Sequence, residues 1–177
     1  MSQAPALIAP RLAELRRLAR LCGAALVRAE RHIAFAESCT GGLLAATCTD
    51  VEGSSAWFEG AFVTYQLRAK CRVLGVSDAQ LQHWGAVSEP IARAMAVGVL
   101  EHCDANIAVS VTGIAGPTGG DATHPVGTVW FAWALRNPHH THTVQTALHL
   151  FPGNRDQVRR AATATALKGV LSVLRRD

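Results

Sequence analysis

Apolar residues along the chain follow two patterns, one typical of helices and one typical of strands. From Leu12 to Leu26 they recur every three or four positions while the arginines fall largely elsewhere, which predicts an amphipathic helix over about residues 6–30. Helices are also expected over residues 40–50, 67–75, 77–84, 88–103 and 155–175. Short apolar runs bounded by turn residues predict strands over residues 32–37, 57–65, 106–111, 127–135 and 142–150.

Cap residues mark the starts of three of these helices. Either Ser77 or Asp78 can cap the fourth helix, and Ser88 can cap the fifth, because short polar side chains accept a hydrogen bond from a free N–H group of the first turn. Asn154 with Gln157 three positions later resembles a capping box at the start of the last helix. These signals place the helix boundaries better than periodicity alone does.

The interleaved order of helices and strands predicts a single three-layer α/β/α domain with a mixed β-sheet over residues 1–177. The last two strands are expected to form a hairpin around Asn137-Pro138. No linker rich in proline, glycine or serine divides the chain. With 177 residues, 49% of them apolar, the chain can bury a sizeable core, so a disordered protein is not expected.

The sequence also predicts where the protein works. No uninterrupted run of about 18 apolar residues is present, so no membrane span is expected. The N-terminus lacks the basic start and apolar core of a secretory signal. The five cysteines form no C-x-x-C pair and are odd in number, which favours reduced thiols. We therefore expect a cytoplasmic protein without a membrane partner.

Positive charge is concentrated at the two ends of the chain. Residues 1–31 carry six arginines and two acidic residues, and residues 155–177 carry six basic and two acidic residues, whereas the middle is acidic overall. Arginine-rich helices could hold nucleic acid. No interleaving of aromatic and basic residues and no nucleic-acid-binding motif accompanies them, so a nucleic-acid partner is not expected.

The first candidate for chemistry is Ser38, which lies between a predicted strand and a helix opened by Gly41 and Gly42. Free N–H groups and the positive dipole end of a new helix can bind an anion or stabilise an oxyanion, so Ser38, Thr40 and the two glycines form a candidate nucleophile and oxyanion site. Two alternatives remain open here. Ser38 or Thr40 could simply be an N-cap, or Cys39 could be the nucleophile.

The second candidate is the pair Tyr65 and Lys70, at the end of a strand that leads into a helix. A serine hydroxyl needs a base at neutral pH, and a lysine can serve if burial lowers its pKa. Tyr65 could relay a proton or hold the leaving group. The alternative is a surface lysine and a tyrosine that packs at a strand end.

The third candidate is the long glycine-rich loop over residues 112–125, which follows a strand. It lacks the Gly-Lys-Ser/Thr ending of a P-loop and the spacing of a dinucleotide-binding motif. Its N–H groups and the Thr112 hydroxyl could hold an anionic substrate, and the alternative is a cluster of structural turns. The histidines at 139, 140 and 142 could bind a metal adventitiously, but a hairpin loop is the simpler interpretation, and neither a metal nor a cofactor is expected.

Together these segments resemble the CinA C-terminal-domain family. The matching blocks are Ala36–Gly42, Gly53–Phe58, Val63–Tyr65, Ala69-Lys70, Gly85–Ser88, Ser110–Pro117, Pro125–Phe131 and Asn154–Arg159. The resemblance covers roughly residues 10–172. Six to eight blocks in the same order make a chance similarity improbable.

The resemblance implies an activity and a set of site residues. The family hydrolyses the carboxamide of nicotinamide mononucleotide to nicotinic acid mononucleotide and ammonia, using a serine nucleophile with tyrosine and lysine and no metal. By position, Ser38, Tyr65 and Lys70 are similar to its catalytic residues. Thr112, Gly113 and Arg155 are similar to its substrate-binding residues. The resemblance also suggests a homodimer or larger homo-oligomer.

This chain departs from the family pattern next to the expected lysine. The family usually has serine and asparagine where this chain has Gln66 and Leu67, so the polar support that those residues give the site is absent. Some longer family members also carry an N-terminal nucleotide-pyrophosphatase domain, which is not expected here, so the resemblance implies only the amidase activity. The competing interpretation is a non-catalytic module that binds a nucleotide or nucleic acid and is linked to competence or DNA damage.

Overall fold

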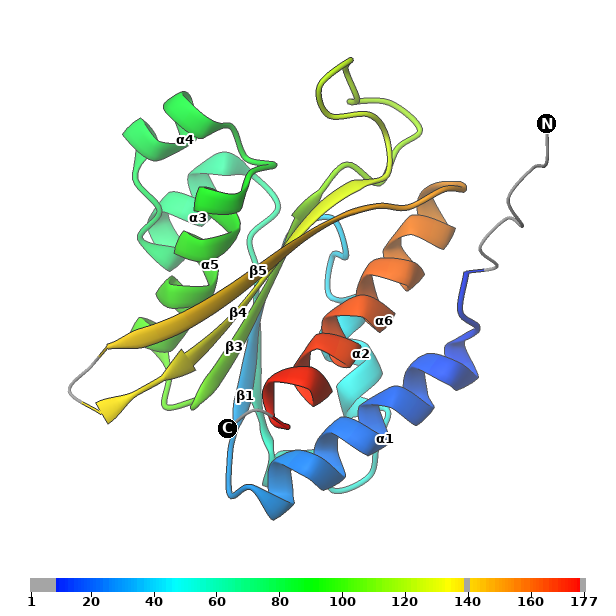
Figure 1. Cartoon of the computed structure of the whole chain (residues 1–177), viewed down its shortest axis with the longest axis vertical. Helices are drawn as coiled ribbons and strands as arrows, with labels where there is room; N and C mark the ends of the chain where they lie inside the picture. Colours follow the sequence, from blue (N-terminus) through cyan, green and yellow to red (C-terminus); the bar gives the residue numbers. More distant parts are fainter. Residues whose placement is uncertain (1–8, 139–140, 176–177) are drawn as a thin grey trace.

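A mixed sheet of five strands runs through the centre of the computed structural model, which describes residues 9–138 and 141–175 (Figure 1). The strand order is β2-β1-β3-β4-β5. Strand β1 is parallel to both of its neighbours, β2 and β3, whereas β4 is antiparallel to β3 and to β5. The strands are β1 (Ile33–Glu37), β2 (Phe58–Val63), β3 (Ile107–Gly113), β4 (Thr128–Arg136) and β5 (His142–Leu150).

Helices cover both faces of this sheet, as Figure 1 shows. One face carries α1 (Leu12–Arg28), α2 (Leu43–Thr49) and α6 (Arg155–Val173). The other face carries α3 (Leu67–Leu74), α4 (Asp78–Trp84) and α5 (Glu89–His102). The predicted three-layer α/β/α architecture and the β4–β5 hairpin are therefore confirmed.

The two faces of the sheet differ in side-chain size because successive residues of a strand point to opposite sides. Phe35, Phe131 and Trp133 pack under α1, α2 and α6, while alanines such as Ala34 and Ala108 face α5. Small side chains allow α5 to lie close to the sheet. All five residues of β1 are buried, as expected for a strand between two parallel neighbours with both faces covered.

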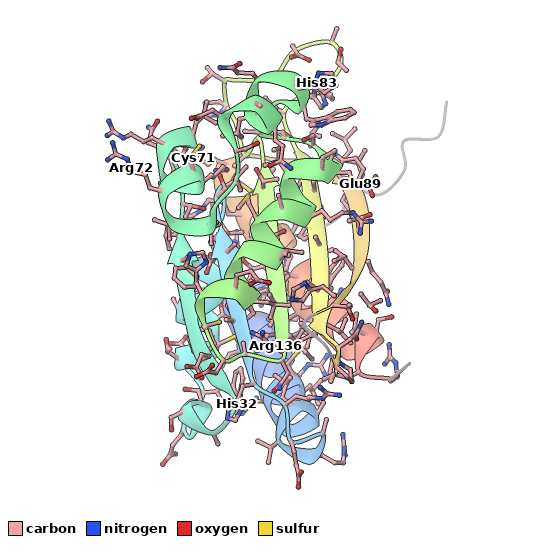
Figure 2. The ribbon with its side chains drawn as sticks, turned by 90° about the vertical axis from the view of Figure 1, so that its left-hand side faces the viewer. His32, Cys71, Arg72, His83, Glu89 and Arg136 are labelled. Carbon is pink, nitrogen blue, oxygen red and sulfur yellow. The ribbon has the colours of Figure 1, made fainter. Side chains whose placement is uncertain are left out.

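The strand–helix contacts at the two ends of α5 fix this helix against the sheet. Arg136 of β4 donates to the carbonyl oxygens of Leu100 and Cys103, which lie at the C-terminal end of α5. At the other end, the Glu89 carboxylate accepts a hydrogen bond from Thr146 of β5 at 3.0 Å. Figure 2 shows Glu89 and Arg136 at opposite ends of this helix.

The predicted elements exist with shifted boundaries. The first helix begins at Leu12, and residues 6–8 of the prediction lie outside the described residues. A short 3-10 helix over Ser54–Ala56 was not predicted. Ser77, rather than Asp78, caps α4 with a complete capping box, and Asn154 with Gln157 forms the predicted capping box of α6. The Ser88 side chain makes no cap bond and donates to the Gly85 carbonyl instead.

Among the described residues, no helix is both long enough and apolar enough to span a membrane.

Candidate active site

Ser38 lies at the carboxyl end of β1, between the two strands that run parallel to it. Its N–H group donates to the Val111 carbonyl of β3 at 3.0 Å, and the Thr64 N–H, just after β2, donates to the Glu37 carbonyl at 2.8 Å. The ends of three parallel strands therefore meet at this residue. Only 8% of Ser38 is exposed.

Lys70 of α3 contacts this serine directly. Its Nζ lies 3.0 Å from the Ser38 Oγ and also donates to the Thr64 carbonyl at 2.6 Å. Lys70 is 1% exposed. Loss of hydration on burial lowers the pKa of Lys70 from 10.5 to about 8, so a neutral amine is accessible near neutral pH.

The Ser38–Lys70 contact has the geometry of a nucleophile and its base. A hydroxyl and an amine at hydrogen-bond distance can exchange a proton, and the lowered pKa brings the lysine close to the working range of a general base. The alternative of a surface lysine is wrong, because Lys70 is buried.

Tyr65 is placed differently from the expectation that it shares a cavity with Ser38 and Lys70. The tyrosine is 54% exposed, and its hydroxyl accepts a hydrogen bond from Arg155 Nη2 at 3.1 Å. Strand β2 ends at Val63, so Tyr65 lies in the link to α3, and only its backbone carbonyl faces the Lys70 amine, at 3.4 Å. The phenol is thus held by Arg155 and not by the Ser38–Lys70 pair.

The two glycines after Ser38 form the tight turn that the sequence predicts, and the predicted cap is wrong. Gly41 has φ +59° and Gly42 has φ +92°, a backbone region in which a side chain is strained. Helix α2 therefore begins at Leu43 rather than near Thr40, with Gly42 as its N-cap and no cap bond from Ser38 or Thr40.

The Glu37 carboxylate occupies the start of α2, a feature that the sequence analysis missed. It accepts hydrogen bonds from the N–H groups of Gly42, Leu44 and Ala45. The Gly41 N–H bonds to the Ser38 carbonyl. The expected oxyanion donors at Gly41 and Gly42 are therefore already used. A glutamate at the end of a buried strand was the signal available in the sequence.

Arg159 of α6 holds the same turn from the other side, and the sequence analysis gave it no role. Its Nη2 and Nε donate to the Thr40 carbonyl at 2.7 and 3.2 Å. Thr40 itself is fully buried, and its hydroxyl has no hydrogen-bond partner in the described structure.

Cys39 does not have the properties of a nucleophile. Its side chain is buried, and desolvation raises the pKa of the thiol to about 12. Because the thiolate is the reactive form, the thiol next to Ser38 is inert near neutral pH.

Thr112 and Gly113 belong to β3 rather than to the loop in which they were predicted. The Thr112 hydroxyl is buried and donates to the Ala86 carbonyl at 2.8 Å. It is therefore not a free donor for an anionic substrate. At Gly113 a Cβ atom would lie 2.5 Å from the Thr128 carbonyl oxygen, so this glycine permits close pairing with β4.

Arg155 connects the loop after β3 with the link after β2. It donates to the Gly116 carbonyl at 2.9 Å as well as to the Tyr65 hydroxyl. Beside it lies a cavity of about 490 Å³, whose lining includes Ala115, Pro117 and Val126. Both partners of Arg155 are neutral oxygens, so its positive charge is available to an anion.

The two departures from the family pattern lie at the start of α3. Gln66 is the N-cap residue of this helix but makes no side-chain cap bond, and Leu67 is exposed. The Lys70–Ser38 contact forms with these residues in place.

The histidine cluster falls partly outside the described residues, which lack 139 and 140. The remaining member, His142, lies in β5 with Nε2 3.5 Å from the Glu101 carboxylate. Within the described part of the chain, no group of three or more histidine, cysteine or acidic residues could hold a metal ion.

A family model, curated relatives and solved structures each match most of this chain. The family model of the CinA C-terminal domain matches residues 15–174. The nicotinamide-nucleotide amidohydrolase PncC of Enterobacter agglomerans is 50% identical over 149 residues, which are 84% of this chain and 88% of that protein. PncC of Escherichia coli strain K12 is 48% identical over 155 residues, or 88% and 92% of the two chains. The crystal structure of the competence damage-inducible protein A (ComA) from Klebsiella pneumoniae subsp. pneumoniae MGH 78578 has a TM-score of 0.86 at 35% identity, covering 91% of this chain and 97% of that one.

Proposed function

Because this chain belongs to the CinA C-terminal domain family, we propose that it hydrolyses the carboxamide of nicotinamide mononucleotide to nicotinic acid mononucleotide and ammonia, with Ser38 as the nucleophile. The observation that carries the proposal is the buried contact of 3.0 Å between Lys70 Nζ and Ser38 Oγ. The names of the two PncC relatives support the substrate.

The neutral Lys70 amine acts first, as the general base. It takes the proton of the Ser38 hydroxyl while Oγ forms a bond to the carboxamide carbon. The resulting ammonium then gives this proton to the amino group, and the C–N bond breaks to release ammonia. A water molecule next attacks the ester, its proton passes to Lys70, and the C–O bond to Ser38 breaks as the hydroxyl is restored.

The oxyanion needs donors other than those at Gly41 and Gly42. We place it beside the N–H group of Thr40, which has no acceptor among the described residues and lies two positions after the nucleophile. The bond from Arg159 to the Thr40 carbonyl fixes this peptide. One such donor contributes about 3–4 kcal/mol to transition-state stabilisation in a well-studied hydrolase.

Arg155 and Tyr65 act on the phosphate side of the substrate in this proposal. The guanidinium offers a positive charge whose present partners are neutral, and the phenol offers a second donor next to it. Arginine binds phosphate oxygens well because its planar donors match their geometry. The cavity beside Arg155 has room for part of a nucleotide.

The test is ammonia release from nicotinamide mononucleotide by the wild type, Ser38→Ala and Cys39→Ala. We expect Ser38→Ala to lose at least about a thousandfold in kcat, because no other nucleophile replaces the serine. Cys39→Ala is the matched control at the adjacent position and should keep kcat within about threefold, because its thiol is buried and neutral. Undiminished turnover in Ser38→Ala would contradict the proposal, and loss of turnover only in Cys39→Ala would move the nucleophile to the cysteine.

A further inference from the structure

Glu37 links the sheet to helix α2 across the turn that carries Ser38. Glu37 is the last residue of β1, and its backbone pairs with Val63 of β2 on one side and Val111 of β3 on the other. Its carboxylate is fully buried and accepts N–H groups of α2 at 2.9 Å from Gly42, 3.1 Å from Leu44 and 2.8 Å from Ala45. One side chain thus spans the whole turn from strand to helix.

The carboxylate fills a place that could otherwise bind a substrate anion. The first turn of a helix offers free N–H groups and a positive dipole end. In this protein three of those N–H groups point at Glu37, so its own carboxylate takes the place of a bound phosphate. A buried carboxylate would cost several kcal/mol without such partners, so these bonds are needed to keep it there.

Arg159 holds the middle of the same turn. Two of its guanidinium nitrogens donate to the Thr40 carbonyl, and α6, from which it reaches, packs against α2. The turn is therefore fixed by an anion at its end and by a cation at its centre, from two different elements. Hydrogen bonds with one charged member are about twice as strong as neutral ones.

We propose that Glu37 and Arg159 are positioning residues that hold the Ser38 turn so that the serine Oγ stays in contact with the Lys70 amine, an inference that rests on the proposed function. Neither side chain touches Ser38 Oγ, and both act through the backbone on either side of it. The position of Oγ depends on this backbone, and a displacement of about 1 Å at a reacting group can lower a rate about a hundredfold.

The variants Glu37→Gln and Arg159→Gln test the proposal. A glutamine keeps the size of Glu37 but has a single acceptor oxygen. Its NH₂ group would face an N–H donor that now has a carboxylate oxygen as its acceptor, so at least one hydrogen bond is lost. Ser77→Ala is the control, because it removes a side-chain hydrogen bond to the first turn of another helix, α4, outside the Ser38 turn. We expect each test variant to lose at least tenfold in kcat with KM changed less than threefold. Ser77→Ala should lower the melting temperature and leave kcat unchanged.

A second readout does not depend on the substrate. The rate at which a fluorophosphonate labels Ser38, followed by intact mass, reports the reactivity of the serine itself. We expect this rate to fall at least tenfold in both variants and to stay unchanged in Ser77→Ala. If the wild type takes up the label but releases no ammonia, the proposed function fails while the labelling rates still decide the inference.

Three results would overturn the inference. The first is a folded Glu37→Gln variant whose kcat and labelling rate stay within twofold of the wild type. The second is an Arg159→Gln variant that raises KM but keeps kcat, since this would make Arg159 a substrate-binding residue. The third is a wild type that neither takes up the label nor releases ammonia. Should Glu37→Gln fail to fold, the kcat and labelling rate of Arg159→Gln decide.

Discussion

Replacement of Lys70 by methionine tests most directly whether burial makes this lysine a general base. The wild-type ammonium is buried, and its pKa is lowered from 10.5 to about 8. At pH 7 the folded protein must therefore hold a charge that burial disfavours. Methionine fills a similar volume without this charge, but it leaves the Thr64 carbonyl and the Ser38 hydroxyl without their amine partner.

The free-energy cost of burying the Lys70 charge follows from the difference between its pKa in the folded and in the unfolded chain. A shift of this size corresponds to about 3 kcal/mol of destabilisation at pH 7. The unfolded chain binds more protons than the folded one between the two pKa values, so the penalty is complete below pH 8 and fades as pH rises towards 10.5. Between pH 7 and pH 9, the wild type should gain about 1 kcal/mol in unfolding free energy relative to Lys70→Met.

The assay is urea unfolding of both proteins between pH 7 and pH 9, at one protein concentration and with a reductant present. The difference between the two curves removes contributions that both proteins share, among them those of the buried Cys22 and Cys48, whose raised pKa values destabilise the fold at high pH. Lost hydrogen bonds at Thr64 and Ser38 shift the Lys70→Met curve by a constant of about 1–3 kcal/mol and leave its slope unchanged.

The protonation of Lys70 should also set the pH dependence of the reaction rate. Because only the neutral amine can take the Ser38 proton, kcat/KM of the wild type should rise with pH and level off above about pH 8. Lys70→Met should lose at least about a hundredfold in kcat. Parallel unfolding curves for the two proteins, or a wild-type rate that is flat from pH 6 to pH 9, would refute the argument that burial makes Lys70 a base.

Three further predictions concern substrate binding and partners. Arg155→Gln should raise KM for nicotinamide mononucleotide about tenfold or more with a smaller effect on kcat, because it removes the charge offered to the phosphate. Steady-state kinetics would instead show a large fall in kcat with little change in KM if Arg155 acted in the chemical step. Thr112→Val should lower the unfolding free energy by about 1–2 kcal/mol and leave KM within twofold, because the threonine hydroxyl donates to the Ala86 carbonyl. A large rise in KM would show that Thr112 contacts the substrate. Duplex DNA should bind weakly even at low salt in a titration, because arginines such as Arg16 and Arg159 already hold partners in the protein, and tight, steeply salt-dependent binding would favour the competing nucleic-acid module.

The expectations about assembly and location stay predictions. A homodimer or larger assembly and a cytoplasmic location follow from the sequence and its resemblance, and a sedimentation measurement would test the first of them directly.

Local pattern was enough to find the elements and several of their ends. The run of buried residues in β1, the two glycines that need positive φ and the capping box at Asn154 are each set by a few neighbouring residues. Such signals depend on interactions within one or two turns of chain, and the sequence displays them directly. The same signals put Ser38 at a strand-to-helix turn.

Local sequence patterns could not predict contacts between residues that lie far apart in the chain. The Lys70 amine reaches Ser38 only because β2 pairs in parallel with β1, which brings the start of α3 beside the end of β1. Composition and periodicity alone could not show that Lys70 is buried, and a buried amine is what lowers its pKa.

The sequence by itself therefore determined the helices, the strands, the glycine turn and the resemblance that identified the candidate residues. The tertiary structure alone decided that Tyr65 turns to Arg155, that Thr112 bonds within the fold, and that Glu37 and Arg159 hold the turn. The physical reason is the range of the forces involved. Secondary structure reflects neighbours a few positions apart, whereas a hydrogen bond between residues 40 and 159 exists only after the sheet order and helix packing have brought α6 against α2.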